Sequence, residues 1–275
     1  MKKQFITIAF TLVAIIFNFN AAKAQELAFA TATPYTFGFN LPIFEPNIAE
    51  PANANPKGAN PAAALDLTGQ GLYELPTEAL VSNAEVIKLD SNLLDKITVS
   101  AGQWSQCRQL FARHNWLEKF PEGTSSMGSL ELMDLTRNHI DALPASVGKL
   151  VSLKKLIMDL NFVTTLPAEV AQMKSLKELS LRWNGLTTLP AEVAQMASLE
   201  VLNLTNNNLS SLPDEIGNMK SLKVLRVNYN NIQKLPATLA NLAGTLKILD
   251  LSNNPMGRQW ISEVKAMLPN TQVIF

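Results

Sequence analysis

Leucines recur along most of the chain in a pattern that repeats at a fixed interval. The motif LxxLxLxxNxLxxLP begins at Leu176 and begins again at Leu199, 23 residues later. Side chains two residues apart on an extended chain point to the same side, so the leucines of LxL mark one buried face of a short strand. Val170, Met173 and Leu176 lie three residues apart, which predicts a short α or 3₁₀ stretch on the return segment.

An asparagine follows each predicted strand at nearly the same interval, with Gln70 as an imperfect first member. We expect each asparagine to turn the chain and to bond backbone groups of the neighbouring turn with its buried amide. Most units close with Leu-Pro or Phe-Pro, and proline suits the first position of a helical turn. The predicted asparagine ladder consists of Asn92, Asn115, Asn138, Asn161, Asn184, Asn207, Asn230 and Asn254.

These repeats resemble the leucine-rich repeat family in a 23-residue form. The stretch from Leu212 to Pro236, LPDEIGNMKSLKVLRVNYNNIQKLP, resembles the Ras-group class of those repeats. The resemblance covers about 62–275 and implies an α/β fold. That fold is a curved solenoid, a right-handed superhelix with a parallel sheet on its concave face and short helical or 3₁₀ turns on its convex face. Each repeat is one coil, because no coil can bury its leucines alone.

The two ends of the chain depart from this period. Residues 1–24 combine a basic start, an apolar run and small residues before Gln25, which is the pattern of a secretory signal peptide. Residues 25–61 are rich in Pro, Ala and Asn and predict a linker or, in part, an N-terminal cap. About nine repeats occupy 62–256, and 257–275 is expected to form a C-terminal cap. Helical spacing within this cap relates Trp260, Ile261, Val264, Met267 and Leu268.

Charge and composition offer little sign of catalysis. Residues 1–24 hold three of the 23 basic residues and none of the 23 acidic ones, so the remainder has 20 basic against 23 acidic residues, a formal net charge of −3. That balance argues against nucleic acid as a partner. Two histidines, His114 and His139, fall in adjacent turns, but no third metal ligand is evident. Cys107 takes a leucine position and is expected to be buried. We therefore predict no enzyme activity, cofactor or metal.

Candidate binding residues lie on the exposed strand face. The position between the two leucines of LxL, and the two positions after the second leucine, should be polar if they only face water. In the middle of the chain they are instead apolar, aromatic or basic, which is the composition of binding hot spots. Trp116 and Phe162, just past their asparagines, join this strip or line its rim, and Asn206 is expected on the surface. The predicted strip comprises Phe111, Arg113, His114, Arg137, Ile157, Asp159, Leu160, Arg182, Trp183, Arg226 and Tyr229.

The sequence therefore predicts an exported module that binds a protein partner through its concave sheet. We expect a monomer in the periplasm, at the cell surface or in the medium of a bacterium, without membrane insertion after signal cleavage. One alternative is a carbohydrate or cell-wall binder that uses Trp183, Tyr229 and Phe111 as stacking platforms. The Ras-group resemblance implies a further alternative, a signalling scaffold.

Overall fold

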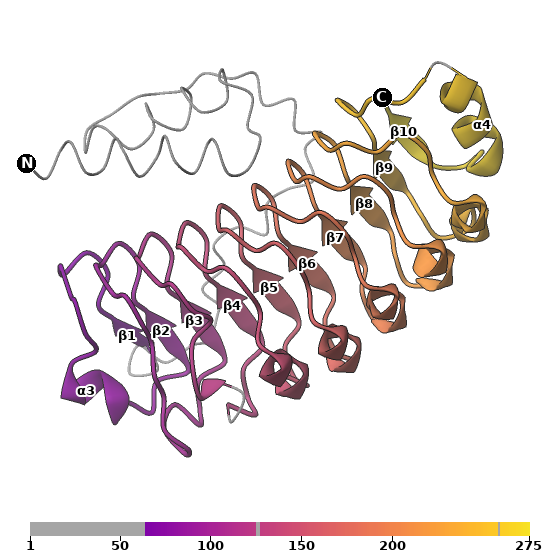
Figure 1. Ribbon diagram of the computed structural model, residues 1–275. Coiled ribbons are helices and arrows are strands. Elements are labelled where there is room, and N and C mark those ends of the chain that lie inside the picture. The colour runs from indigo at the N-terminus through magenta and orange to yellow at the C-terminus, as the bar shows by residue number, and fades with distance from the viewer. Residues whose placement is uncertain (1–63, 125–126, 258) are drawn as a thin grey trace, which may run out of the picture. The chain divides into compact units, whose positions relative to one another are not determined.

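The computed structural model describes residues 64–275 apart from 125–126 and 258. The predicted signal peptide over 1–24 and the linker over 25–61 lie outside the described residues. Within them, ten parallel strands form one sheet whose order follows the chain (Figure 1). The strands are β1 Ala64–Asp66, β2 Val86–Lys88, β3 Gln109–Phe111, β4 Leu132–Asp134, β5 Lys155–Ile157, β6 Glu178–Ser180, β7 Val201–Asn203, β8 Val224–Arg226, β9 Ile248–Asp250 and β10 Gln272–Ile274.

The strand register follows the leucine period. Leu179 of β6 lies opposite Leu202 of β7, and Leu202 lies opposite Leu225 of β8. These central leucines are at most 1% exposed, while the residues on either side of them point to the opposite face of the sheet. The repeat length therefore places chemically equivalent residues in columns that run across the strands.

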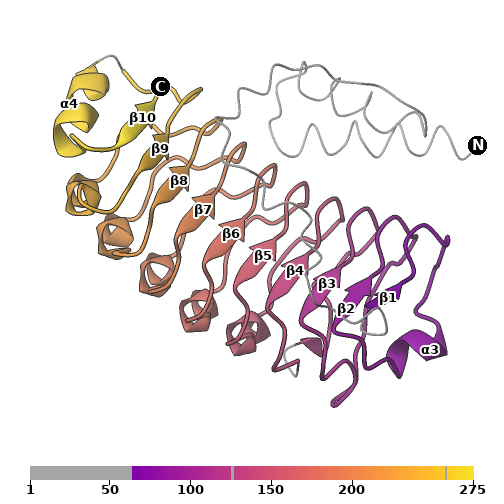
Figure 2. The ribbon, with the colours of Figure 1, turned by 180° about the vertical axis from the view of Figure 1, so that it is seen from behind.

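Most return segments form helical turns on the side opposite the exposed strand face. Five of those that the structure describes in full are 3₁₀ helices, and each begins directly after a proline with an extended backbone, Pro144, Pro167, Pro190, Pro213 or Pro236. Figure 2 shows them in a row along one side of the ribbon. They are η3 Ala145–Lys149, η4 Ala168–Gln172, η5 Ala191–Gln195, η6 Asp214–Asn218 and η7 Ala237–Leu242; the short helix α3, Thr77–Leu80, precedes them.

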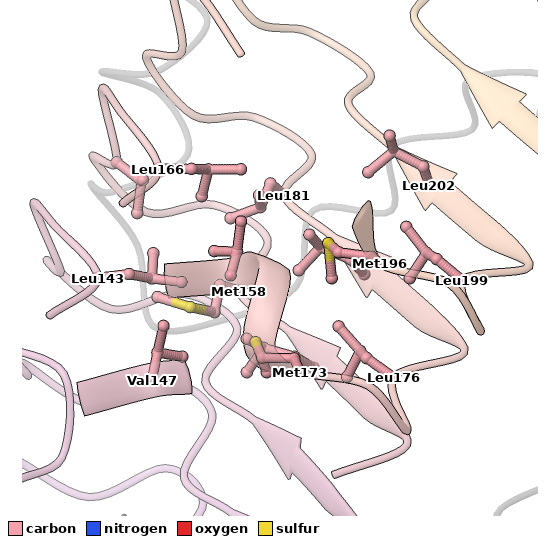
Figure 3. Packing of buried hydrophobic residues seen from close by; sticks show 14 of the residues in the cluster. Leu143, Val147, Met158, Leu166, Met173, Leu176, Leu181, Met196, Leu199 and Leu202 are labelled. Atoms are coloured by element: carbon pink, nitrogen blue, oxygen red, sulfur yellow. The ribbon is translucent and has the colours of Figure 1, made fainter. Parts of the chain in front are cut away.

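A continuous apolar core fills the space between the sheet and the helical turns (Figure 3). Met158 and Leu181 come from the strand side, and Val147 and Met173 come from the convex side. All four side chains are at most 1% exposed. Each coil thus buries its leucines against the coils before and after it, which makes the stack one cooperative core.

The C-terminal segment forms helix α4, Gln259–Met267, followed by β10. Val264 and Leu268 are buried in the core cluster, and β10 pairs with β9. Ile261 is 37% exposed, so the prediction that it shares the buried helix stripe was wrong. It lies one residue, and hence about 100° around the helix, from Trp260, which packs on the core. Nowhere in the described part of the chain is a helix long and apolar enough to cross a membrane.

Candidate binding face

The asparagine column fixes the edge of the strand face. In the turn of Asn184, the side-chain Oδ1 accepts the N–H of Val163 at 2.9 Å, and Nδ2 donates to the carbonyl of Met158 at 2.9 Å. Both partners belong to the preceding coil, so the amide ties consecutive coils together. The same pair of bonds to the preceding coil is made by Asn92, Asn115, Asn138, Asn161, Asn207, Asn230 and Asn254.

The residue before each of these asparagines has a left-handed backbone. Its φ lies between 54° and 57° in Ser91, His114, Arg137, Leu160, Trp183, Asn206, Tyr229 and Asn253. This region is uncommon for residues other than glycine, asparagine and aspartate, and strained for bulky ones. Sequence reasoning missed this feature, although Gly69, Asn206 and Asn253 in the same column were a readable signal of it.

This left-handed column carries the large exposed side chains of the strip. Trp183 is 38% exposed and Tyr229 is 49% exposed, while Leu160 is half-buried. Asn206, one coil beyond Trp183, is only 6% exposed, so the expectation that it is a surface residue was wrong. Asn206 is thus buried, while Trp183 and Tyr229 in the coils before and after it are exposed.

Part of the predicted basic surface is already neutralised within the protein. Arg113 donates to Asp90 Oδ2 from Nε at 3.1 Å and from Nη2 at 2.7 Å. Its guanidinium also lies 5.5 Å from the ring centroid of Phe111. A planar guanidinium held by a fork of two bonds is well fixed. The side chains of Arg113 and Phe111 are therefore fixed in place, and the positive charge of Arg113 is largely neutralised by Asp90.

The second pair of this kind is looser. Arg182 Nε lies 4.0 Å from Asp159 Oδ2. Asp159 Oδ1 accepts the Ser180 hydroxyl at 2.6 Å and the Arg182 backbone N–H at 2.9 Å. Burial nevertheless raises the pKa of Asp159, and burial likewise raises the pKa of neighbouring Asp134. These carboxylates are held by the sheet and are not free to reach a partner.

Arg137 and Arg226 remain as the uncommitted cations of the face. Arg137 is exposed and Arg226 is half-buried, and neither forms an ion pair with another described residue. His114 lies in the same column as Arg137, and its pKa is lowered by burial and then by the charge of Arg137. A neutral His114 between cations leaves the basic character of the face to the arginines.

One column of the strand face was missed by sequence reasoning. The first residue of each strand also points outward, because both neighbours of the central leucine share one side of the sheet. Lys155 and Glu178 form a 2.9 Å ion pair in this column. Sequence reasoning included the residue after the central leucine and two positions beyond the strand but left out the residue before the central leucine, although the period of two places it on the same face. The half-buried apolar members of the missed column are Leu132, Val201, Val224 and Ile248.

Trp116 and Phe162 lie apart from the strip, on the loops that leave the strands. His139 lies between them, with ring centroids 5.9 Å from Trp116 and 5.7 Å from Phe162. His139 therefore stacks with aromatic rings in place of approaching His114. In the described part of the chain, no group of three His, Cys, Asp or Glu side chains is arranged to hold a metal ion. Cys107 is fully buried, and burial raises the pKa of its thiol to about 12.

Comparison with known proteins agrees with this architecture. The leucine rich repeat family model matches residues 151–209 and 197–256. The repeat region of this chain is a leucine-rich repeat domain, and its parallel sheet with short 3₁₀ turns is the curved solenoid of that family. No curated protein is significantly similar to the chain.

Several solved structures share the fold. A leucine-rich repeat protein of Leptospira interrogans is 30% identical with a TM-score of 0.63, over 77% of this chain and 60% of that one. The ectodomain of the Arabidopsis thaliana receptor kinase GASSHO1/SCHENGEN3, solved in complex with CASPARIAN STRIP INTEGRITY FACTOR 2, is 29% identical with a TM-score of 0.58, over 70% of this chain and 27% of that one. A TDR receptor at 22% identity and a TM-score of 0.56, over 77% of this chain and 46% of that one, shows the fold alone. The chain spans 60% or less of each of these proteins.

Proposed function

We propose that this protein is an exported leucine-rich repeat module that binds a protein partner through its concave sheet. The fold supports protein binding in general, and one similar structure is a receptor ectodomain solved with a bound factor. The pattern of residues 1–24 supports export. Sequencing the N-terminus of the exported protein tests this part, and we expect it to begin at Gln25.

The observation that carries the proposal is the choice of residues in the left-handed column. Asn206 and Asn253 occupy this backbone conformation at little cost. Leu160, Trp183 and Tyr229 occupy the same conformation at a cost of about 1–3 kcal/mol each. Trp183 and Tyr229 are exposed, so the burial of their side chains does little to offset the backbone strain. Bulky residues in a strained and exposed position are best explained by contacts with a partner.

The chemistry of the face favours a protein over a glycan. Arg137 and Arg226 are available to pair with carboxylates, and the exposed ring of Trp183, on a coil between theirs, offers an aromatic contact to the same partner. The carbohydrate alternative relies on open ring faces, yet the guanidinium of Arg113 lies over the ring of Phe111. Arginine and aromatic side chains are the residue types that dominate binding energy at protein interfaces.

The variant Trp183→Asn separates binding from stability. Asparagine fills this position in the next coil, so the backbone strain falls while the ring is lost. We expect the free energy of unfolding to stay within about 1 kcal/mol of the wild type, because reduced strain offsets lost packing. Partner affinity should fall by about 2 kcal/mol or more, or roughly 30-fold. Arg182→Ala should weaken binding in the same direction.

The experiment uses the wild type and matched variants as baits for affinity capture from envelope and host extracts. Titration calorimetry then measures the affinity of the protein that the wild type retains. Lys174→Ala and Glu192→Ala on the convex side should leave affinity within about 0.5 kcal/mol. A protein retained by the wild type and by both convex variants, but lost with Trp183→Asn, supports the proposal. A protein lost with the convex variants and retained by Trp183→Asn assigns binding to the convex side and overturns it.

A further inference from the structure

Three aromatic side chains from successive coils lie in a row beyond the asparagine ladder. Trp116, His139 and Phe162 each follow a ladder asparagine, and their ring centroids are 5.9 Å and 5.7 Å apart. Trp116 is 59% exposed and Phe162 is 45% exposed. We call these three residues the aromatic ridge. Single surface aromatics are common, whereas contiguous exposed patches mark interaction sites.

The orientation of the rings limits what the aromatic ridge can recognise. His139 and Phe162 are stacked at an interplanar angle of 18°, so each covers one face of the other. Trp116 is tilted by 54° against His139 and keeps more of its ring face open. A sugar that lies flat along the row needs several open faces, which a stack does not offer. A single cation above one indole face fits this arrangement, because Trp is the best aromatic ring for cation–π contact.

Acidic side chains lie on the coils of Trp116 and His139 and on the coil before them. Asp95, Glu118 and Asp141 lie in one column, each three positions past its ladder asparagine, and Asp141 pairs with Lys119 at 2.7 Å. Asp95 and Glu118 form no ion pair with any residue that the structure describes, and neither does Lys96, the basic residue of the coil before Lys119.

The acidic column ends at Asp141, on the coil of His139, one coil before the aromatic column ends at Phe162. Its next members are Thr164 and Thr187, and Gly185 follows Phe162 in the aromatic column. The coil of Trp116 therefore supplies both an indole ring and, two residues later, the carboxylate of Glu118, which has no ion pair among the described residues. The loops that carry the aromatic ridge therefore favour a positively charged group, whereas the corresponding loops of the later coils lack these carboxylates.

We propose that the aromatic ridge is a second docking surface, which takes a basic protein segment through an arginine side chain. The guanidinium lies on the open face of Trp116 and pairs with Glu118, while its aliphatic stem packs along the ring edges. Arginine suits this site better than lysine, because its planar cation stacks on an aromatic face and binds a carboxylate at the same time. The aromatic ridge lies outside the concave strip, so this proposal does not depend on the proposed function.

Fluorescence anisotropy of labelled hexa-arginine, titrated with the purified chain at about 0.15 M salt, tests the proposal. We expect saturable binding that is stronger than that of hexalysine. Trp116→Ala should weaken hexa-arginine binding about 3- to 5-fold, as expected for an exposed cation–π contact. Trp116→Phe should retain part of the affinity, and Glu118→Gln should weaken it about 2- to 3-fold. Thermal unfolding of each variant checks that the fold is kept.

Matched controls lie elsewhere on the same molecule. Asn231 occupies the position of Trp116 in a later coil and is exposed, so Asn231→Ala should bind hexa-arginine as the wild type does. Trp183→Asn on the concave face should do the same. Absence of saturable hexa-arginine binding overturns the proposal. The proposal is also overturned if hexa-arginine and hexalysine bind equally well and Trp116→Ala changes neither affinity, because that result indicates diffuse charge attraction. Binding of chitohexaose without hexa-arginine, lost in Trp116→Ala, assigns the aromatic ridge to a glycan and also overturns it.

Discussion

The first coils and the later coils of the solenoid share one sheet but differ on the convex side. From 145 to 246, every return segment is a 3₁₀ helix that begins after a proline (Figure 1). Between 89 and 128, apart from residues 125–126, which are not described, the return segments are turns and extended stretches in which only Thr124 has a 3₁₀ conformation, and an isolated bridge links Thr98 with Glu122. Strand register and asparagine bonds are nevertheless the same in both regions.

The difference follows from what fills the convex side of the core. In the later coils a valine, isoleucine or leucine of the 3₁₀ helix faces inward, as Val170 does at 1% exposure. In the earlier region Trp104 takes up this space at 1% exposure, and its Nε1 donates to the carbonyl of Ala79 at 2.6 Å. One large ring thus replaces several small contacts, and the segment around it lacks the proline that would begin a helix.

This contrast separates the parts of a coil that define the stack from the parts that can vary. The apolar strand residues and the asparagine recur in nearly every coil, because the apolar side chains pack against both neighbouring coils and the asparagine bonds to the preceding one. The convex segment only has to fill the convex side of the apolar core, so different sequences can form it. The family model matches 151–256, within which every return segment is of the regular type. The aromatic ridge begins in the irregular region and ends at the start of the regular one.

The largest expected effect distinguishes the two ways of filling the core. Trp104→Ala should lower the free energy of unfolding by about 3–5 kcal/mol, because it leaves a large cavity and an unbonded carbonyl. Met173→Ala, at a buried convex position of the regular region, should cost about 2–4 kcal/mol. Denaturant unfolding monitored by circular dichroism measures both. A larger loss for Met173→Ala contradicts the view that one ring holds the irregular region together.

A smaller effect, equal in the two regions, is expected for the asparagine ladder. Asn115→Ala in the irregular region and Asn184→Ala in the regular region should each cost about 1–3 kcal/mol, because each leaves buried backbone groups of the preceding coil unbonded. Asn231→Ala, an exposed position next to the ladder, should cost less than about 0.5 kcal/mol. Unequal losses of the free energy of unfolding in Asn115→Ala and Asn184→Ala would show that the ladder asparagines stabilise the two regions to different extents.

Cys107 tests the strand side of the irregular region. It occupies a position filled by leucine in the later coils, and Cys107→Ser should cost about 1–2 kcal/mol by burying a hydroxyl. Because the pKa of the folded thiol is about 12 and that of an ordinary thiol is near 9, the folded state holds its proton more strongly. The thiol's contribution to stability is therefore lost as pH rises from about 9 to about 12. Rapid reaction of native Cys107 with a thiol reagent at neutral pH would contradict its burial.

The sequence predicts the architecture well because each coil repeats the same local rule. Leu179, Leu202 and Leu225 lie where a period of 23 residues places them. The candidate face is less predictable, because it depends on side-chain choices that do not repeat. The sequence does not reveal that Arg113 is paired with Asp90, since that bond joins residues 23 positions apart on neighbouring coils. Nor does it reveal that His139 stacks with Trp116 and Phe162, since a ring can turn either way from its loop.

The smallest effect concerns the two aspartate–arginine pairs, one in each region. Asp159→Asn keeps an oxygen that can accept the Ser180 hydroxyl and the Arg182 N–H, but removes the charge. Burial raises the pKa of Asp159 in the folded state, so the folded state binds this proton more strongly than the unfolded state. The free energy of unfolding of the wild type therefore falls as pH rises from about 3.8 through the raised pKa.

The variant Asp159→Asn lacks that titration, so its stability relative to the wild type should rise over the same window and then stay level. We expect a gain below about 1 kcal/mol at neutral pH, because Arg182 is 4.0 Å away and compensates the charge only weakly. Asp90→Asn is the control from the irregular region, and it should lose stability at neutral pH because it breaks the 2.7 Å bond to Arg113. Urea unfolding at several pH values measures the difference. A relative stability of Asp159→Asn that falls as pH rises would show that the ionised Asp159 is held by Arg182 as firmly as Asp90 is held by Arg113.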